Sequence, residues 1–388
     1  MANILLVNEY GEGNFHINLL LYASKLLTAL GHNCHFGIPI LNKSTSSLVS
    51  SGYKVFQAPI LPPEVNFHQN KKSPSLTDFI SKRGFLDVNR MKTITEIWEN
   101  ELKIRKIDLI FTNFAPTILQ VARQKIPVIN LGTYWDTPSI LLKTIPKFNK
   151  DSVEDEKILE TLVKVFGASR VPNTMPKVLH GDRNLIVTEP EFDYNHPKNA
   201  KPRAVGSFEA ENVIKHKNFI ISKKAFVYLH SYRPNALRIL KELAKLNYKI
   251  DAYIPKFNSG DKERYKSKNL SFVDKKTYKE LQENYALVIN HGGLGMGQNM
   301  MFLGLNQILI PSHRENLINS SIISGLKFGS TINQQLQKSI DKKQFEKIFD
   351  EMFSNKKQEE IWEKTQLFRL RKRPNVKEII IKLSKTFI

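Results

Sequence analysis

The sequence predicts an α/β protein with two parallel sheets. Short runs of β-branched and aliphatic residues alternate with helical patterns in both halves of the chain, which is typical of βαβ units. The chain has 388 residues, more than one hydrophobic core usually serves, and 41% of them are hydrophobic. Each half also contains a glycine-rich loop between a strand pattern and a helix pattern. We therefore expect two Rossmann-like domains.

The first half begins the alternation at its first residues. We expect strands at 4–7, 33–37, 54–58, 109–112 and 128–131, and helices at 15–30, 91–103 and 116–124. Gly31 is suited to end the first of these helices. The segment 61–90 is polar and irregular, with prolines at 62, 63 and 74, so we expect loops there.

The second half repeats the alternation after a basic linker that is broken by prolines. We expect strands at 225–229, 249–253, 270–273, 286–290 and 307–310, and helices at 235–246, 278–283 and 297–303 and from 315 and 341. The predicted domains are an N-terminal domain of residues 1–214 and a C-terminal domain of residues 215–358. A helical tail, 359–388, with a break at Pro374, is expected to cross back to the N-terminal domain.

The charge of the chain is strongly positive. Its 58 basic residues outnumber its 37 acidic residues, giving a formal net charge of +21, which favours polyanions such as anionic lipid, nucleic acid or phosphorylated substrates. The alternative is that the positive charge has no specific partner and comes from lysines spread over solvated surfaces. No helix-turn-helix, zinc-finger or RNP-like motif is found, so we expect no nucleic-acid partner.

A cytoplasmic location is expected. The single cysteine, Cys34, cannot form an internal disulfide, no Cys and His residues have zinc spacing, and neither a secretory signal nor a membrane span is found. The segments 79–85, 140–150 and 368–373 combine basic with apolar residues. Peripheral binding to an anionic membrane at its inner face, with these segments as contacts, is therefore an open alternative.

The first glycine-rich loop, residues 11–16, does not match a dinucleotide site. That fingerprint needs a third glycine where His16 stands, and an acidic residue about twenty positions further on. The second loop, residues 290–297, contains four glycines and His291. Its backbone, the following helix N-terminus and the imidazole are suited to a pyrophosphate, whereas an ordinary strand-to-helix turn is the alternative.

The residues after His291 read HGGLGMGQNMMFLGLNQILIPSHRENLIN. This run, within a match over 274–319, resembles the donor signature of inverting UDP-glycosyltransferases, the family 1 superfamily with bacterial macrolide and antibiotic enzymes and glucuronosyltransferases. The start of the chain, with ILLV, then HIN, then ALGH closing the first helix, resembles the same family. The likeness is weak over residues 60–220. It implies the GT-B fold, in which two Rossmann-like domains face each other across a cleft.

The resemblance also implies a reaction. It is transfer of a hexosyl group from a nucleotide-diphosphate sugar to an acceptor hydroxyl, with inversion and without a metal. His16 would be the general base, and Asn113 stands where the family usually has an aspartate that orients this histidine. An amide can hold the ring tautomer but cannot stabilise imidazolium by charge. A catalytically weakened or inactive relative, acting as a sugar-nucleotide-binding, auxiliary or membrane-associated protein, is the alternative.

The donor site implied by the resemblance lies in the second half. Its residues would be Ser231, His291, Gly292, Gly293, Gly295, Met296, Asn299, Glu315 and Asn316, while Gly11 and Gly13 would lie near the donor phosphate or the acceptor. Met296 replaces a hydroxyl residue, Asn299 replaces an acidic residue that binds the ribose, and Lys275 replaces an aromatic residue on the base. The co-substrate would be of the UDP or dTDP type, with no further cofactor and no metal, and the acceptor a small or lipid-like molecule.

Overall fold

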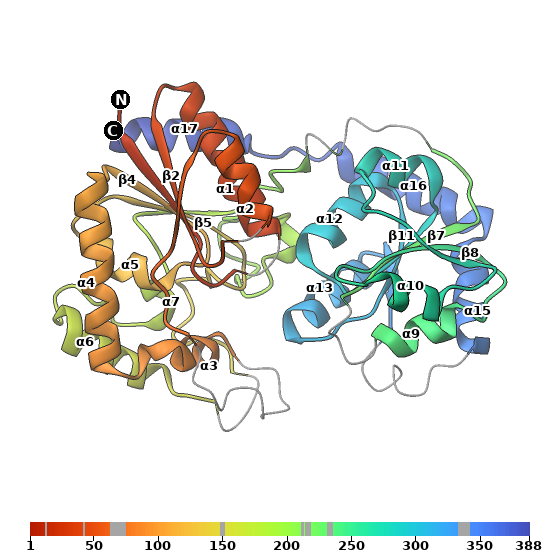
Figure 1. Cartoon of the computed structure of the whole chain (residues 1–388), viewed down its shortest axis with the longest axis horizontal. Coiled ribbons are helices and arrows are strands. Elements are labelled where there is room, and N and C mark those ends of the chain that lie inside the picture. Colours follow the sequence, from red (N-terminus) through yellow and green to blue (C-terminus); the bar gives the residue numbers. More distant parts are fainter. Residues whose placement is uncertain are drawn as a thin grey trace. The chain divides into compact units, whose positions relative to one another are not determined.

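The protein consists of two compact units, Met1–Phe208 with Arg373–Ile388 and Glu209–Lys372. The structure is a computed structural model, and it describes residues 1–11, 14–41, 43–62, 75–147, 152–210, 213, 219–230, 236–332 and 342–388. Each unit contains one parallel sheet of six strands with helices around it (Figure 1). The expected fold class, two Rossmann-like sheets, is confirmed.

The first sheet has the strand order β3-β2-β1-β4-β5-β6, which is the Rossmann order. Its strands are β1 (Asn3–Val7), β2 (Asn33–Ile38), β3 (Lys54–Gln57), β4 (Leu109–Thr112), β5 (Val128–Gly132) and β6 (Arg183–Ile186). Successive strands are added toward one edge from β1 to β3 and toward the other edge from β4 to β6. The strand order therefore reverses between β1 and β4, where Val7 pairs with Thr112. Ligands of such sheets bind at this switch point, beyond the carboxyl ends of the strands.

The helices of the first unit cover this sheet. They are α1 (Asn14–Ala29), α2 (Lys43–Ser50), α3 (Leu76–Ile80), the π-helix η2 (Ser81–Phe85), α4 (Val88–Arg105), α5 (Pro116–Ala122), α6 (Asp155–Phe166), α7 (Met175–Val178), η3 (Pro190–Phe192) and α17 (Val376–Phe387). In α1, Leu20, Ala23 and Leu27 are buried at helical spacing, so one face of the helix packs on the sheet. α17, from the end of the chain, lies beside α1 (Figure 1).

The second sheet repeats the Rossmann order when its strands are counted from β7. The order is β12-β11-β10-β7-β8-β9, with β7 (Lys224–Tyr228), β8 (Lys249–Tyr253), β9 (Leu270–Phe272), β10 (Leu287–Asn290), β11 (Asn306–Leu309) and β12 (Gly329–Thr331). Its helices are α9 (Ala236–Leu243), α10 (Ser259–Tyr265), α11 (Tyr278–Asn284), α12 (Leu294–Leu303), α13 (Arg314–Gly325), α15 (Lys342–Met352) and α16 (Asn355–Arg369). The switch point lies between β7 and β10.

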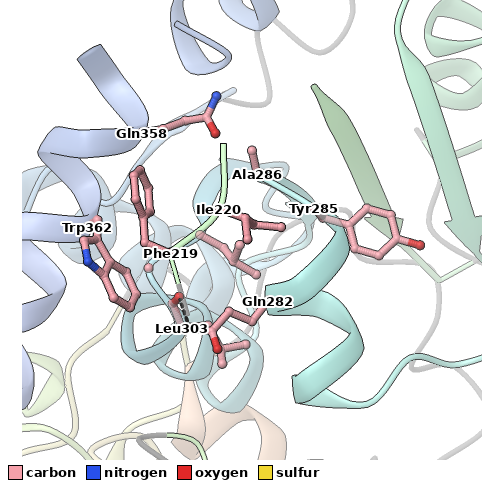
Figure 2. Close-up of a pocket in the computed structure, with 10 residues that line it drawn as sticks. Phe219, Ile220, Gln282, Tyr285, Ala286, Leu303, Gln358 and Trp362 are labelled. Atoms are coloured by element: carbon pink, nitrogen blue, oxygen red, sulfur yellow. Dashed lines mark hydrogen bonds between the residues drawn. The ribbon is translucent and has the colours of Figure 1, made fainter. Parts of the chain in front are cut away.

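The segment that leads into β7 is fastened to α16. Phe219 stacks on Trp362, with ring centroids 5.6 Å apart (Figure 2). The Gln358 side chain both accepts from Ser222 N and donates to Ser222 O, each at 3.1 Å. The cavity that remains among these side chains measures about 10 Å³. A space of that size holds about one water, so this contact is structural.

The expectation of loops over 61–90 is wrong for residues 76–82 and 88–90, which are helical, whereas Arg83 and Gly84 form a kink with non-helical φ and ψ. Ser75 begins α3 with a capping box, since its hydroxyl accepts from Asp78 N at 3.0 Å while the Asp78 carboxylate accepts from Ser75 N at 2.9 Å. The same carboxylate accepts from Val153 N at 2.8 Å, which adds a tertiary anchor. Residues 63–74 lie outside the described residues.

Candidate functional site at the two switch points

His16 lies in the first turn of α1 and on its buried face. Leu19 and Leu20, three and four positions later, are fully buried against the sheet. The imidazole therefore points to the carboxyl edge of the first sheet, where β1 and β4 end. Its Nδ1 lies 2.5 Å from the Oδ1 of Asn113, the residue that follows β4.

Asn113 fixes the tautomer of this histidine. The side chain is fully buried, and its Nδ2 donates to the Leu131 carbonyl at 2.5 Å, so its Oδ1 faces the ring. An amide oxygen can only accept, and the proton of a neutral imidazole is therefore on Nδ1. Nε2 keeps its lone pair. Burial lowers the pKa of His16, and the hydrogen bond to Asn113 opposes this only in part.

Gly11 makes room for the imidazole. A Cβ atom at this position would lie 2.4 Å from Cγ of His16. Asn8, fully buried after β1, holds the glycine from both sides: its Oδ1 accepts from Gly11 N at 2.7 Å and its Nδ2 donates to Gly11 O at 2.9 Å. Gly13 lies outside the described residues.

Glu9 is a buried carboxyl group that the sequence analysis missed. It accepts from the backbone N–H groups of Thr117 and Ile118, each at 2.8 Å, at the start of α5. Burial raises its pKa to about 7, although these two hydrogen bonds act in the opposite direction. Glu9 thus ties the end of β1 to α5. The only local signal was an acidic residue directly after an apolar strand.

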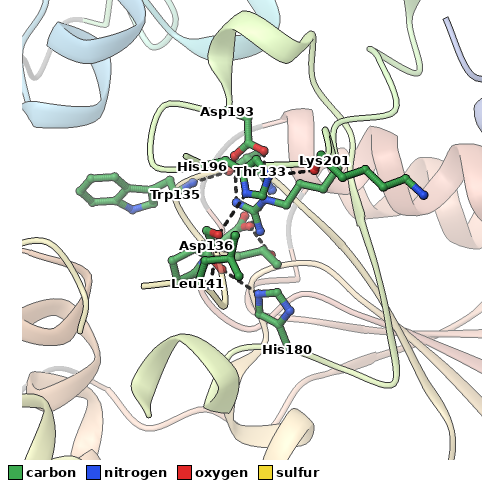
Figure 3. Close-up of polar contacts among 12 residues, drawn as sticks. Thr133, Trp135, Asp136, Leu141, His180, Asp193, His196 and Lys201 are labelled. Carbon is green, nitrogen blue, oxygen red and sulfur yellow. Dashed lines mark hydrogen bonds and ion pairs between the residues drawn. The ribbon is translucent and has the colours of Figure 1, made fainter. Parts of the chain in front are cut away.

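The loop after β5 is held by a second group of polar contacts (Figure 3). Asp136 accepts from Thr133 N at 2.7 Å, and burial raises the pKa of Asp136 to about 6. Ser139 Oγ lies 3.0 Å from Nδ1 of His196. Trp135 projects away from this group, half-buried (Figure 3). These contacts fix the loop. The contact with His196 was not recognised from the sequence because that residue lies 57 positions from Ser139.

The second glycine loop follows β10 and leads into α12. Gly292 has a φ of +76°, and a Cβ there would lie 2.2 Å from the Ser320 hydroxyl and 2.8 Å from the Asn316 carbonyl. Its N–H donates to Asn290 Oδ1 at 2.8 Å. Gly293 caps α12, while Gly295 and Met296 lie in its first turn. Gly292 therefore gives the loop a backbone shape that only glycine adopts easily.

Aromatic and imidazole rings gather at the carboxyl ends of β7, β8 and β10. The ring of His291 lies 5.0 Å from that of His230 and 5.6 Å from that of Tyr228, which stacks on Tyr253 at 6.0 Å. The sequence analysis identified His291 but neither tyrosine. Ser231, which it also identified, lies outside the described residues.

Glu315 and Asn316 lie in the first turn of α13. Asn316 is buried, and its Nδ2 reaches the Gly292 carbonyl at 3.4 Å, so this amide supports the glycine loop. Glu315 is half-buried. Asn299, on the second turn of α12, is buried and donates to Glu209 Oε2 at 2.5 Å. Lys275 is exposed, in the segment between β9 and α11.

Two further features of the described residues bear on function. Within them, no three His, Cys, Asp or Glu side chains come together as metal ligands would. None of their helices has the length and apolar character needed to cross a membrane.

Comparison with solved structures identifies the fold. The glycotransferase of kitacinnamycin superposes with a TM-score of 0.66 at 14% identity, covering 100% of this chain and 99% of the other. The glycosyltransferase SnogD from Streptomyces nogalater gives 0.62 at 15%, covering 100% of both chains. The spinosyn rhamnosyltransferase SpnG complexed with thymidine diphosphate gives 0.65 at 11%, covering 99% and 100%. The chain has the GT-B fold. No known family profile and no curated protein sequence matches it.

Each of the two switch points brings several of the predicted site residues together. The first brings Gly11, His16 and Asn113 together, and the second brings His291, Gly292 and Asn316 together. The structure does not place Asn299 with the second group, since its amide contacts Glu209 and Tyr278 instead.

Proposed function

We propose that this protein is an inverting, metal-independent glycosyltransferase that moves a hexose from a nucleotide-diphosphate sugar to an acceptor hydroxyl. The observation that carries the proposal is the hydrogen-bonded chain from the Leu131 carbonyl through Asn113 to His16. It leaves Nε2 of a neutral imidazole as a base at the edge of a GT-B sheet. A base must hold its lone pair at the working pH, and the lowered pKa of His16 supports this.

In the proposed reaction, Nε2 of His16 takes the proton of the acceptor hydroxyl as its oxygen attacks the anomeric carbon. The new C–O bond forms on the face opposite the leaving group, so the configuration inverts. The bond between the sugar and the diphosphate breaks, and the charge develops on the diphosphate. The negative charge on the diphosphate would be stabilised by the N-terminus of α12, by Gly292 and by His291.

We assign donor binding to the second unit because of the groups that surround its glycine loop. Its glycine loop opens a ten-residue helix, and two imidazoles stand beside it. One of the similar structures holds thymidine diphosphate, which supports a donor of the UDP or dTDP type. Gly293, Gly295 and Met296 would offer backbone N–H groups to the phosphates, and Glu315 would bind sugar hydroxyls.

The first test is calorimetric titration with UDP, dTDP, GDP and their sugar conjugates. We expect one nucleotide sugar to bind, and His291→Ala and Glu315→Ala to weaken it. His16→Ala should then leave binding unchanged and lower turnover by about 10²- to 10⁴-fold. His32→Ala, three residues beyond the last residue of α1, is the matched control. Absence of binding by every nucleotide would refute the proposal, and a product of retained configuration would refute inversion.

A catalytically weakened relative is the second candidate. The observation that favours it is the neutral Asn113 beside His16, because an amide does not stabilise an imidazolium as a carboxylate would. It predicts nucleotide binding without measurable transfer to any acceptor hydroxyl. Nucleotide binding by the wild type, with transfer no faster than that of His16→Ala or of a sample without protein, would support this candidate over the enzyme.

Peripheral membrane contact is a separate candidate. Of the three segments considered from the sequence, Phe85 in 79–85 and Phe368 in 368–373 are buried. In 140–150, Ile140 and Leu141 are 49% and 56% exposed. Lys143, also exposed, would favour an anionic surface. Flotation with anionic liposomes tests this contact, and replacing Ile140 and Leu141 by serine should abolish it.

A further inference from the structure

Two side chains from separate segments, Asn299 and Tyr278, meet at the carboxylate of Glu209 in the second unit. The Oε2 atom of Glu209 lies 2.5 Å from the Nδ2 of Asn299 and 3.2 Å from the Tyr278 hydroxyl. The Tyr278 hydroxyl and the Asn299 Nδ2 are also 2.5 Å apart. The Asn299 amide therefore donates to Glu209 Oε2 and to the Tyr278 hydroxyl oxygen, and the Tyr278 hydroxyl donates to Glu209 Oε2.

The amide of Asn299 is incompletely satisfied. Its NH₂ group must face the Glu209 carboxylate, because an amide oxygen there would repel it. The Oδ1 atom is consequently turned elsewhere, and it is buried without a hydrogen-bond partner on a side chain that is 1% exposed. A buried acceptor is seldom left unpaired in a native protein. A hydroxyl donor from a bound molecule would satisfy it.

The place of this group matches one part of a nucleotide. Asn299 lies five positions after Leu294, the first residue of α12, or about 7.5 Å along the helix axis from the glycine loop. Tyr278 begins α11, just beyond the carboxyl end of β9. With the diphosphate at the N-terminus of α12, the next part of the nucleotide is its ribose, whose adjacent hydroxyls suit a carboxylate.

We propose that Glu209 binds the ribose hydroxyls of the donor nucleotide, with Asn299 and Tyr278 as the residues that position its carboxylate. This inference rests on the proposed nucleotide-sugar donor. The carboxylate accepts from the 2′- and 3′-hydroxyls, and one of them also reaches Asn299 Oδ1. Glu209 precedes β7 and lies 90 residues from Asn299 in the sequence, so no local motif marks it.

The test is calorimetric binding of three nucleoside diphosphates with the same base: the ribo, the 2′-deoxy and the 2′,3′-dideoxy compounds. Wild type should bind the ribo compound about 10- to 100-fold more tightly than the dideoxy compound, as expected for hydrogen bonds to a charged group. Glu209→Gln should lose most of that preference and bind the dideoxy compound as wild type does. Glu283→Gln, at the other end of α11, is the matched control and should change neither value.

The outcomes distinguish failure of the inference about Glu209 from failure of the proposed nucleotide-sugar donor. Glu209→Gln that weakens all three compounds equally would show a structural role and overturn the inference, as would an unchanged preference for the ribo compound. Wild type that binds none of them would refute the nucleotide-sugar donor itself. If Glu209→Gln does not fold, Tyr278→Phe should weaken the ribo compound several-fold and leave the dideoxy compound unaffected.

Discussion

The first sheet ends β1 beside β4, and the second ends β7 beside β10, so each unit has a switch point of the same kind. Val7 pairs with Thr112 in one, and Tyr228 pairs with Asn290 in the other. The residue that follows is therefore equivalent in the two units: Asn113 in the first and His291 in the second. The amide at this position orients the imidazole of His16 on α1, whereas the imidazole of His291 lies beside a glycine loop.

The glycines of the two units also act in different ways. Gly11 follows β1, and its missing Cβ leaves space for the ring of His16. Gly292 follows β10, and its positive φ gives the loop backbone its shape. The comparison teaches that the missing Cβ makes room for a side chain in one unit and shapes the backbone in the other. Under the proposed function, the first arrangement would serve proton transfer and the second would bind an anion. The same substitution should therefore have different consequences in each unit.

The largest effect is expected from Gly11→Ala. The backbone of Gly11 does not have a positive φ, so alanine can adopt it, but its Cβ would lie 2.4 Å from Cγ of His16 and displace the ring. A base moved by about 1 Å loses on the order of 100-fold in rate, so turnover should fall by at least that factor while nucleotide affinity is unchanged. Steady-state kinetics and calorimetry measure the two quantities. Unchanged turnover would contradict the assigned role of Gly11.

Gly292→Ala should instead act on binding and stability. Alanine with a positive φ costs on the order of 1–3 kcal/mol of unfolding free energy, and its Cβ would contact the Ser320 hydroxyl. We expect nucleotide affinity to fall about tenfold, since an interaction of about 1.4 kcal/mol would be lost. Denaturation and calorimetry check both values. Gly325→Ala, where a Cβ would meet no atom within 4 Å, is the control. An equal effect there would contradict the role assigned to the backbone of Gly292.

The strands that carry the two sites were predictable because they are continuous apolar runs between turn residues. β1 and β4 are fully or largely buried, and their sequences contain ILLV and LIFT. The edge strands β6 (RNLI) and β12 (GST) were missed, because they are short and polar and their pairing with a neighbouring strand defines them. The capping box that begins α3 was readable from Ser75 and Asp78, but the surrounding prolines favoured loops.

The candidate site was predictable only where it is local. His16 and the glycine loop after β10 stand next to strand ends in the sequence, and the family resemblance pointed to Asn113. Glu9 was missed because its partner Thr117 is 108 residues away, and Glu209 because Asn299 is 90 residues away. Contacts at such separations depend on sheet order and helix placement, and neither is written in a local pattern.

The smallest effect, and the sharpest on the first switch point, is expected from Asn113→Asp. In wild type, burial holds the pKa of His16 below its ordinary 6.5, so the acid limb of the kcat/KM profile should lie below pH 6.5. A carboxylate favours imidazolium and raises that pKa, and the limb should move to higher pH by about one unit or more. The lost donor to Leu131 should also lower the unfolding free energy by about 1–3 kcal/mol. Asp108→Asn, at the opposite end of β4, should leave the limb in place. A limb that does not move in Asn113→Asp would mean that His16 is not the titrating base.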